Sequence, residues 1–358
     1  MKTIRDFNVK KKKVLVRCDF NVPLSEEGNV LDDFRIKKTL PTIEYLIKKG
    51  AKIILMSHLG RPEKNQKSKI KNQKYSLKPI ALKLEELLKK PVRFLSNCIG
   101  EKIEKEIKKT AEGEIVLLEN LRFHKEEEGY PKKEGENFAK ELAKLGQIFI
   151  NDAFGASHRA HASIIGIPKF LPSGIGFLLE KEIKNLDRII KTPKLPLIAI
   201  IGGKKVEDKA KVINKISKFA DFILIGHLIG EELTKTQIHL KHPLKIVKPI
   251  DGLNGGDTFF DIGPKTINLF KGKIKKAKTI FWAGPLGKIE ERNFQTGSKE
   301  IAKAIIESKA FSVVGGGETV EFLNEIKIAE KFNHISTGGG AMLEYLAGEE
   351  LPGLKVLL

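Results

Sequence analysis

Val14-Leu15-Val16-Arg17-Cys18-Asp19-Phe20-Asn21 begins as a short apolar run and ends in charged and polar residues. Similar runs in the first half of the chain lead into polar clusters at 57–61, 119–122 and 151–152. In the second half the runs lead into glycines, at 202–203, 315–317 and 338–340. Short apolar runs that alternate with helical segments are typical of α/β proteins with parallel sheets.

The residues that follow the apolar runs predict where ligands bind. Ligands of open α/β sheets lie outside the carboxyl ends of the strands. The charged clusters of the first half therefore predict cationic side chains that grip oxyanions, whereas the glycines predict bare backbone amides that cradle phosphates. We expect the chain to hold two phosphorylated ligands, one in each half.

Length and composition favour a two-domain protein of the cytoplasm. A chain of 358 residues exceeds what one core usually supports, and its hydrophobic fraction of 41% is enough for sizeable cores. No apolar run is long enough for a membrane span, and the N-terminus lacks the apolar segment of a signal peptide. The only cysteines are Cys18 and Cys98, without metal-ligand spacing, which fits a reducing compartment.

The net charge of +20 allows two interpretations. It could indicate a nucleic-acid partner, whose affinity would then depend steeply on salt. The lysines are spread over helices and loops, however, and their runs lack interleaved aromatic residues. We therefore expect no specific nucleic-acid partner and no membrane partner, and interpret the charge as a field that favours small anionic substrates.

Helical periodicity organises the chain into two α/β domains with parallel sheets. Apolar spacing predicts helices over 36–47, 81–90 and 136–145, and a longer helix over 175–190 that connects the domains. The predicted boundaries are 1–170 for the first domain, 171–191 for the connecting helix and 192–344 for the second domain. Strands of the second domain are expected at 197–201, 222–225, 246–247, 279–282, 311–314 and around Ile335.

Arginine stands in or near the strand-end loops although the chain is rich in lysine. Its planar fork suits carboxylate and phosphate oxygens better than the point charge of lysine. A single arginine could equally serve a surface ion pair, and Asp19 with Asn21 could equally form an Asx turn. The histidines His58 and His158 follow strands beside arginines. The arginines concerned are Arg17, Arg35, Arg61, Arg122 and Arg159.

Glycine-rich turns dominate the second half. Gly202-Gly203 opens a helix on which Lys205 and Lys209, four residues apart, share a face that can neutralise a polyphosphate. Neither a P-loop nor a G-x-G-x-x-G fingerprint is present. After the glycines at 315–317, Glu318 could hold Mg²⁺ and Thr319 could contact a phosphate.

Several motifs together resemble the phosphoglycerate kinase family. They are Asp-Phe-Asn-Val-Pro at 19–23, Ser-His-Leu-Gly-Arg-Pro at 57–62, Leu-Glu-Asn-Leu-Arg-Phe at 118–123, Asn-Asp-Ala-Phe-Gly at 151–155 with His-Arg-Ala-His at 158–161, and the segments 315–319 and 336–341. The resemblance covers almost the whole chain. It implies two Rossmann-like domains joined by a helix, with the C-terminal tail, about 345–358, packed back on the first domain. It also implies a monomer that transfers a phosphoryl group reversibly from 1,3-bisphosphoglycerate to ADP with Mg²⁺, giving 3-phosphoglycerate and ATP.

The resemblance also assigns roles to individual residues. The expected phosphoglycerate ligands are Asp19, Asn21, Arg35, His58, Arg61, Arg122 and Arg159. The expected catalytic groups are Arg35, Lys205, Gly316 and Gly339. The expected adenine-nucleotide ligands are Lys205, Lys209, Glu290, Gly316, Gly317, Glu318 and Thr319, with Glu318 also the metal ligand.

The chain departs from the family pattern on the nucleotide side. Lys204 and Ala283 replace an alanine and an asparagine of the pattern, Glu318 replaces an aspartate, and a glycine-rich stretch is replaced by 226–230. These changes motivate a second hypothesis, a phosphoglycerate-binding paralogue with weakened or altered nucleotide use.

Overall fold

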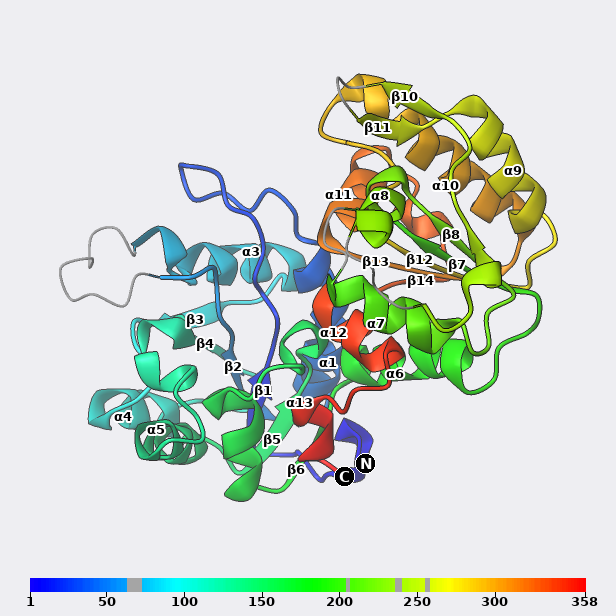
Figure 1. Cartoon of the computed structure of the whole chain (residues 1–358). Coiled ribbons are helices and arrows are strands. Elements are labelled where there is room, and N and C mark those ends of the chain that lie inside the picture. Colours follow the sequence, from blue (N-terminus) through cyan, green and yellow to red (C-terminus); the bar gives the residue numbers. More distant parts are fainter. Residues whose placement is uncertain (63–72, 204–206, 236–239, 255–257) are drawn as a thin grey trace. The chain divides into compact units, whose positions relative to one another are not determined.

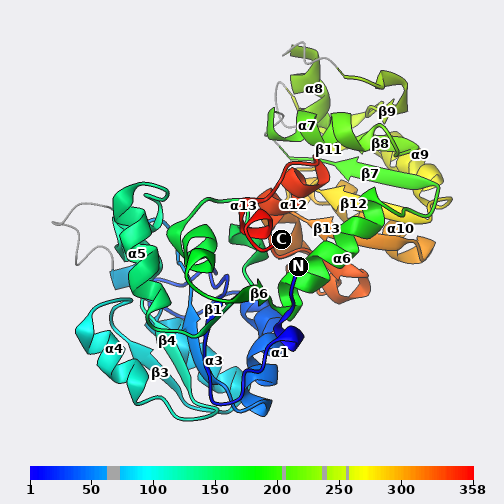
Figure 2. The ribbon, with the colours of Figure 1, turned by 90° about the horizontal axis from the view of Figure 1, so that it is seen from below.

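The computed structural model describes residues 1–62, 73–203, 207–235, 240–254 and 258–358. The chain forms two compact units, one of Met1–Glu182 with Glu350–Leu358 and the other of Ile183–Glu349. Helix α6 (Phe177–Ile190) contains the boundary. The C-terminal segment is anchored in the first unit, where the Gly353 amide donates to the Ser157 carbonyl at 2.9 Å. The two ends of the chain lie side by side there (Figures 1 and 2).

The first unit is built on a parallel six-stranded sheet. The strands follow the order β3-β4-β2-β1-β5-β6. Neighbouring strands are parallel throughout, with Val14 of β1 opposite Ile53 of β2 and Ile148 of β5. Their bounds are β1 Lys13–Arg17, β2 Lys52–Met56, β3 Val92–Leu95, β4 Ile115–Leu118, β5 Ile148–Asn151 and β6 Ser173–Ile175.

Alternating side chains of these strands bury two apolar cores, one on each face of the sheet. On β1, Val14 and Val16 belong to one core, which includes residues of α1 (Phe34–Lys48) and α3 (Lys78–Leu88). Leu15 belongs to the other core, with residues of α4 (Glu101–Lys108) and α5 (Lys133–Ala143). Because both faces are covered, the central strands are apolar along most of their length and carry polar side chains mainly at their ends.

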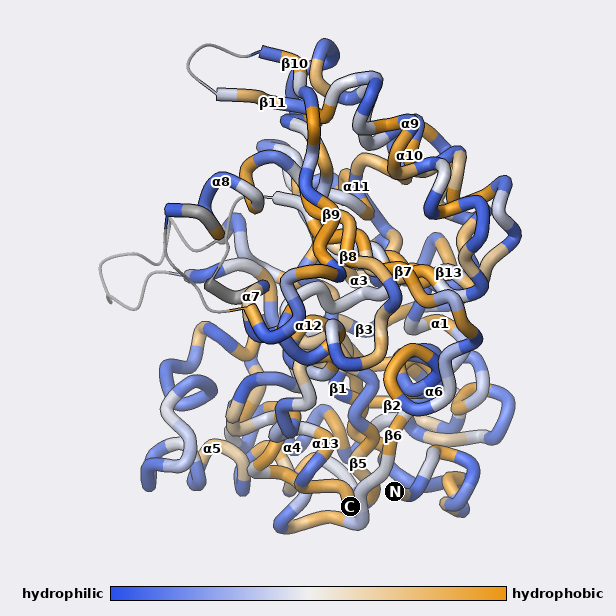
Figure 3. The backbone as a smooth tube through the Cα atoms, turned by 45° about the vertical axis from the view of Figure 1, so that its right-hand side comes forward, coloured by the Kyte–Doolittle hydropathy of each residue, from blue (hydrophilic) through white to orange (hydrophobic). Residues whose placement is uncertain are grey.

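The second unit repeats the architecture with the doubly wound strand order. Its parallel sheet runs β14-β13-β12-β7-β8-β9, so the chain order reverses between β7 and β12. Strands β10 (Gly252–Asn254) and β11 (Phe259–Ile262) form a separate antiparallel pair. Figure 3 shows β7 and β8 as hydrophobic strands, in keeping with their burial. The sheet strands are β7 Leu197–Ile201, β8 Phe222–Ile225, β9 Ile246–Val247, β12 Thr279–Ala283, β13 Phe311–Gly315 and β14 His334–Ile335.

Helices of this unit connect the strands and begin at the glycine-rich turns. Helix α11 follows β13 directly, and α12 follows β14 after a short turn. No helix in the described ranges is long and apolar enough to cross a membrane. The helices are α7 Glu207–Ile216, α8 His227–Lys235, α9 Pro264–Ile274, α10 Thr296–Ser308, α11 Gly317–Glu325 and α12 Gly339–Leu346, while α13 Pro352–Lys355 lies in the C-terminal segment.

The predicted fold class is confirmed, with two parallel sheets in an α/β protein. Strands β3 and β6 were missed by the sequence interpretation, as was the β10–β11 hairpin. In β6 the centre is Gly174, a residue that weakens strand propensity. A side chain there would meet Phe7 at 2.7 Å and the Lys2 carbonyl at 2.8 Å, so contact with the N-terminal segment explains the glycine.

Candidate active site

In the first unit, the loop after β1 is tied to the start of α1. Arg35 lies in the first turn of α1, and its Nη1 is 3.3 Å from both carboxylate oxygens of Asp19. The same nitrogen donates to the Asn21 carbonyl at 3.1 Å. Asp19 also accepts from the Asn21 amide, as in an Asx turn. The Arg35 side chain retains 28% exposure, so the guanidinium is both oriented and accessible.

A second chain of hydrogen bonds joins the loops after β1, β2 and β4. The Gly60 amide donates to Asn21 Oδ1 at 2.8 Å, and the Gly60 carbonyl accepts from Arg122 Nη1 at 2.6 Å. Gly60 has a φ of +59°, which glycine adopts without strain. Arg122 forms an ion pair with Glu128 at 3.1 Å. Burial lowers the pKa of Arg122, and the Glu128 carboxylate opposes that shift.

A buried polar cluster lies behind these loops. Arg17, the last residue of β1, is fully buried, and its Nη2 is 3.2 Å from His58 Nδ1. Its Nε donates to Ser163 Oγ at 2.8 Å. Glu127, also fully buried, accepts from both the hydroxyl and the amide of Ser163 and lies 3.7 Å from Arg17. The buried charges of Arg17 and Glu127 thus have each other as partners.

The histidines of this region are held neutral by their surroundings. Burial, followed by the charges of Arg17 and Arg122, lowers the pKa of His58 well below its usual range. The same causes bring the pKa of His161 to about 3. Burial and Arg159 also lower the pKa of His158, whose Nε2 accepts from Arg159 Nε at 3.2 Å. Burial is the largest cause of each shift, and the arginine charges that add to it provide the positive field that an anionic substrate needs.

The structure therefore brings together most of the predicted residues of the first half. Asp19, Asn21 and Arg35 form one group, which Gly60 joins to Arg122. His58 and Arg159 belong to the same positively charged region, since Arg159 contributes to the lowered pKa of His58. Arg61 follows Gly60 directly and is exposed, and no contact among the described residues joins it to that group.

In the second unit, the turns after β7 and β12 touch where the strand order reverses. The Gly202 amide donates to the Ala283 carbonyl at 2.9 Å and the Gly203 amide to the Pro285 carbonyl at 2.8 Å. A side chain at 202 would stand 2.0 Å from the Pro285 carbonyl oxygen, so only glycine fits. Lys209 of α7 is buried, and its ammonium donates to the Gly202 carbonyl.

The glycine turns after β13 and β14 also meet. A Cβ at Gly339 would lie 3.0 Å from Gly316 Cα. Gly316 has a φ of +100° and precedes the first turn of α11, whose free amides attract anions. Thr319 in that turn is fully buried, and its hydroxyl has no hydrogen-bond partner in the described part of the chain. Gly316, Gly317, Thr319 and Gly339 thus gather at one edge of the sheet.

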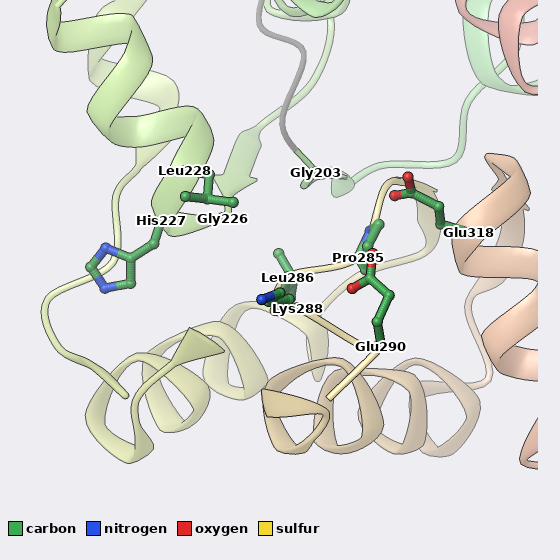
Figure 4. A pocket seen from close by; sticks show the side chains of 10 residues that line it. Gly203, Gly226, His227, Leu228, Pro285, Leu286, Lys288, Glu290 and Glu318 are labelled. Carbon is green, nitrogen blue, oxygen red and sulfur yellow. The ribbon is translucent and has the colours of Figure 1, made fainter. Parts of the chain in front are cut away.

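A pocket lies at the turns after β7, β8 and β12, beside the first turn of α11 (Figure 4). Leu228 and Leu286 supply apolar walls, while Glu290 and Glu318 supply carboxylates. The described residues contain no group of three or more metal-binding side chains, and Glu318 is one of the two carboxylates that line this pocket. The predicted Lys205, and Lys204, lie outside the described residues.

Sequence reasoning missed several residues that organise the first site. Glu127 and Ser163, which support Arg17, and Asn120, which holds the 59–60 turn by accepting from the Leu59 amide at 3.2 Å, had no assigned role. Glu127 stands between Glu126 and Glu128, so nothing in the sequence distinguishes the buried carboxylate from its neighbours. Asn120 lies directly after a predicted strand, a position that could have indicated its role.

The fold and the two sites define a two-unit α/β protein that presents cationic side chains in one unit and glycine-rich amides in the other. The phosphoglycerate kinase family profile matches residues 4–240 and 234–349. The phosphoglycerate kinase of Borrelia garinii subsp. bavariensis is 43% identical, covering 100% of this chain and 99% of the relative. That of Coprothermobacter proteolyticus is 42% identical with the same coverage.

Solved structures agree. The crystal structure of phosphoglycerate kinase from Pyrococcus horikoshii OT3 matches with a TM-score of 0.88 and 34% identity, over 100% of this chain and 98% of that one. The enzyme from Coxiella burnetii gives a TM-score of 0.82 and 30% identity, over 99% and 98%. The chain belongs to the phosphoglycerate kinase family.

The activity follows from this membership. The protein is a phosphotransferase of glycolysis that moves a phosphoryl group between 1,3-bisphosphoglycerate and ADP. The relatives named above are all phosphoglycerate kinases, so the comparisons give no support to a paralogue with altered nucleotide use. The family match consists of two segments that overlap at 234–240.

Proposed function

We propose that the first unit binds the phosphoglycerate through the residues at the ends of β1, β2, β4 and β5. Arg35 is the accessible cation, oriented by Asp19 and the Asn21 carbonyl. His58, Arg122 and Arg159 supply the positive field around it. Asp19 and Asn21 carry oxygens suited to the substrate hydroxyl. Arg61, which is exposed, completes the set expected from the family motifs.

The nucleotide is proposed to bind the second unit at the pocket of Figure 4. The contact of Gly316 with Gly339 concentrates backbone amides where the phosphates would lie. Lys205 and Lys209 would add charge, Glu290 would meet the ribose, and Leu228 and Leu286 would line the base. Mg²⁺ usually takes one or two carboxylates from the protein, and the substrate phosphates supply further oxygen ligands. The single carboxylate of Glu318 therefore suits that ion. Bound Mg²⁺ would neutralise phosphate charge.

Phosphoryl transfer asks the protein for alignment and dispersed positive charge rather than for a nucleophile. The acyl phosphate is already a reactive donor. Arg35 would stabilise charge on the transferring group, and Lys205 with the amides of Gly316 and Gly339 would do the same on the nucleotide side. We further propose a cytoplasmic monomer, on the family resemblance and the cysteine content.

The observation that carries this assignment is the geometry of Arg35, held by Asp19 and Asn21 at a strand-end loop. Arg35→Ala should lower kcat in a coupled assay of ATP formation by 10²–10³-fold, as for other donors to a developing anion (about 2.7–4 kcal/mol). Arg5→Ala removes an arginine from an exposed ion pair with Glu180 and serves as the control. Equal activity of the two variants would remove Arg35 from the mechanism.

A further inference from the structure

One guanidinium of the first unit is enclosed by protein. The Arg17 side chain has no exposed surface. It donates from Nε to Ser163 Oγ at 2.8 Å and from Nη1 to the Cys18 carbonyl at 2.5 Å, and Nη2 lies 3.2 Å from His58 Nδ1. A side chain held in this way does not contact a ligand itself. Among its contacts, His58 is the residue that belongs to the proposed phosphoglycerate site.

The chemistry of the pair fixes the position of the imidazole proton. A guanidinium carries only donors, so His58 Nδ1 must be the acceptor in the contact with Arg17. The ring proton of the neutral imidazole then resides on Nε2. Among the described residues, the hydrogen bond of the His58 ring is the one at Nδ1, which leaves the Nε2–H available to an oxyanion.

Glu127 supplies the counter-charge that makes a buried arginine tolerable. Its Oε1 lies 3.7 Å from Arg17 Nη2, and Ser163 donates to both of its oxygens at 2.5 and 2.9 Å. Because Ser163 contacts both partners, it fixes their relative positions. The charged or titratable groups that act on the His58 ring are Arg17, Arg122, His161 and Arg159, and together with burial they disfavour the imidazolium.

We propose that Arg17 is a positioning residue that holds His58 as a neutral Nε2–H donor for the substrate anion, with Glu127 as its counter-ion. The inference rests on the proposed role of His58 in acid binding, and it adds the group that determines what His58 offers. The sequence places Arg17 in or near a strand-end loop and assigns it no ligand, whereas its burial assigns it to the support of His58.

Nitrogen NMR of the histidine-labelled full chain, without substrate, tests the tautomer directly. The His58 signals, assigned by their loss in His58→Ala, should show Nε2 protonated and Nδ1 unprotonated at neutral pH. A wild-type spectrum with Nδ1 protonated overturns the proposal, whatever the kinetics show.

Two variants that differ only at position 17 isolate the arginine. Glu127→Gln retains an oxygen for Ser163 and leaves Arg17 in place, so the Nε2–H form should persist. Adding Arg17→Met removes the donor without leaving an unpaired buried charge. In this double variant, His58 should populate forms with Nδ1 protonated. The KM for 3-phosphoglycerate should rise by about tenfold relative to Glu127→Gln, with a smaller change in kcat, because a charge-assisted hydrogen bond is weakened.

The control is Arg93→Met with Glu114→Gln, which removes a half-buried ion pair of the same unit, joined at 2.7 Å. It should leave the His58 spectrum and the KM unchanged. An identical spectrum and KM in Glu127→Gln and the double variant would refute the positioning role. If His58→Ala leaves the KM for 3-phosphoglycerate unchanged, the proposed role of His58 fails, and the wild-type spectrum still decides the question of Arg17.

Discussion

Asp152 should make the stability of the first unit depend on pH in the neutral range. The carboxyl is fully buried after β5, and its Oδ1 accepts from the Leu179 amide in the first turn of α6 at 3.1 Å. Burial raises its pKa from 3.8 to about 7, although the hydrogen bonds that the carboxylate accepts oppose the shift. The native state therefore holds a proton that the unfolded chain has already lost, and stability falls as the pH rises from about 4 to 7.

The rise in the pKa of Asp152 from 3.8 to about 7 corresponds to a loss of stability of roughly 4 kcal/mol in total as the pH rises. About 2.5 kcal/mol of this loss falls between pH 5 and 8. Asp152→Asn mimics the neutral acid, so its stability lacks this dependence on pH. The free energy of unfolding of the variant, relative to wild type, should therefore increase by about 2.5 kcal/mol from pH 5 to pH 8.

Urea unfolding followed by far-UV circular dichroism measures this difference. The only tryptophan, Trp282 in β12, reports on the second unit and separates its transition from that of the first. Asp33→Asn, which removes a carboxylate of the first unit paired with Lys37 at 2.9 Å, is the control. A difference between wild type and Asp152→Asn that stays constant from pH 5 to 8 would show that the buried carboxyl is ionised throughout.

Two further predictions concern the second unit. Burial raises the pKa of Asp261 to about 6, so the free energy of unfolding of Asp261→Asn should increase by about 1.4 kcal/mol relative to wild type from pH 5 to pH 8. Trp282 fluorescence measures this difference, and a difference that does not change with pH would contradict the prediction. Gly339→Ala places a Cβ 3.0 Å from Gly316 Cα, which should raise the KM for ADP several-fold and leave the KM for the phosphoglycerate unchanged; an equal rise in both would indicate general damage to the fold.

The sequence was sufficient to predict what depends on the strands. Most of the buried parallel strands are apolar along their length, so the apolar runs located most strands of both sheets and the loops with Arg35, His58 and Gly316, whereas β3 and β6 were missed. Pairings between distant positions could not be predicted. Arg17 and Ser163 are 146 residues apart, and only the packing of the folded unit shows that this arginine is turned inward.

The sequence also could not predict which backbone segments approach each other closely. The reason for glycine at 202 is the Pro285 carbonyl, which belongs to a strand end more than 80 residues later in the chain. The sequence shows that glycines recur, and the fold shows which of them are sterically required. The departures at 226–230 have a structural setting at the start of α8, beside the pocket, which the residues alone did not give.

The groups proposed to bind anions have different electrostatic costs in the two units. Cations placed in buried loops need counter-charges in the free protein, and Arg17, Arg35 and Arg122 have them in Glu127, Asp19 and Glu128. Backbone amides need none, because a dipole carries no net charge to desolvate.

An anion that approaches Arg35 must therefore compete with Asp19, whose carboxylate already lies 3.3 Å away. This competition weakens binding of any anion that offers only charge. A substrate that also satisfies Asp19, through a hydroxyl that donates to its carboxylate, recovers the loss. If Arg35 binds the substrate anion as proposed, the Asp19–Arg35 pair would favour an acid that bears a hydroxyl beside its anionic group over a simple phosphate or carboxylate, and this selectivity would arise from the carboxylate rather than from the arginine.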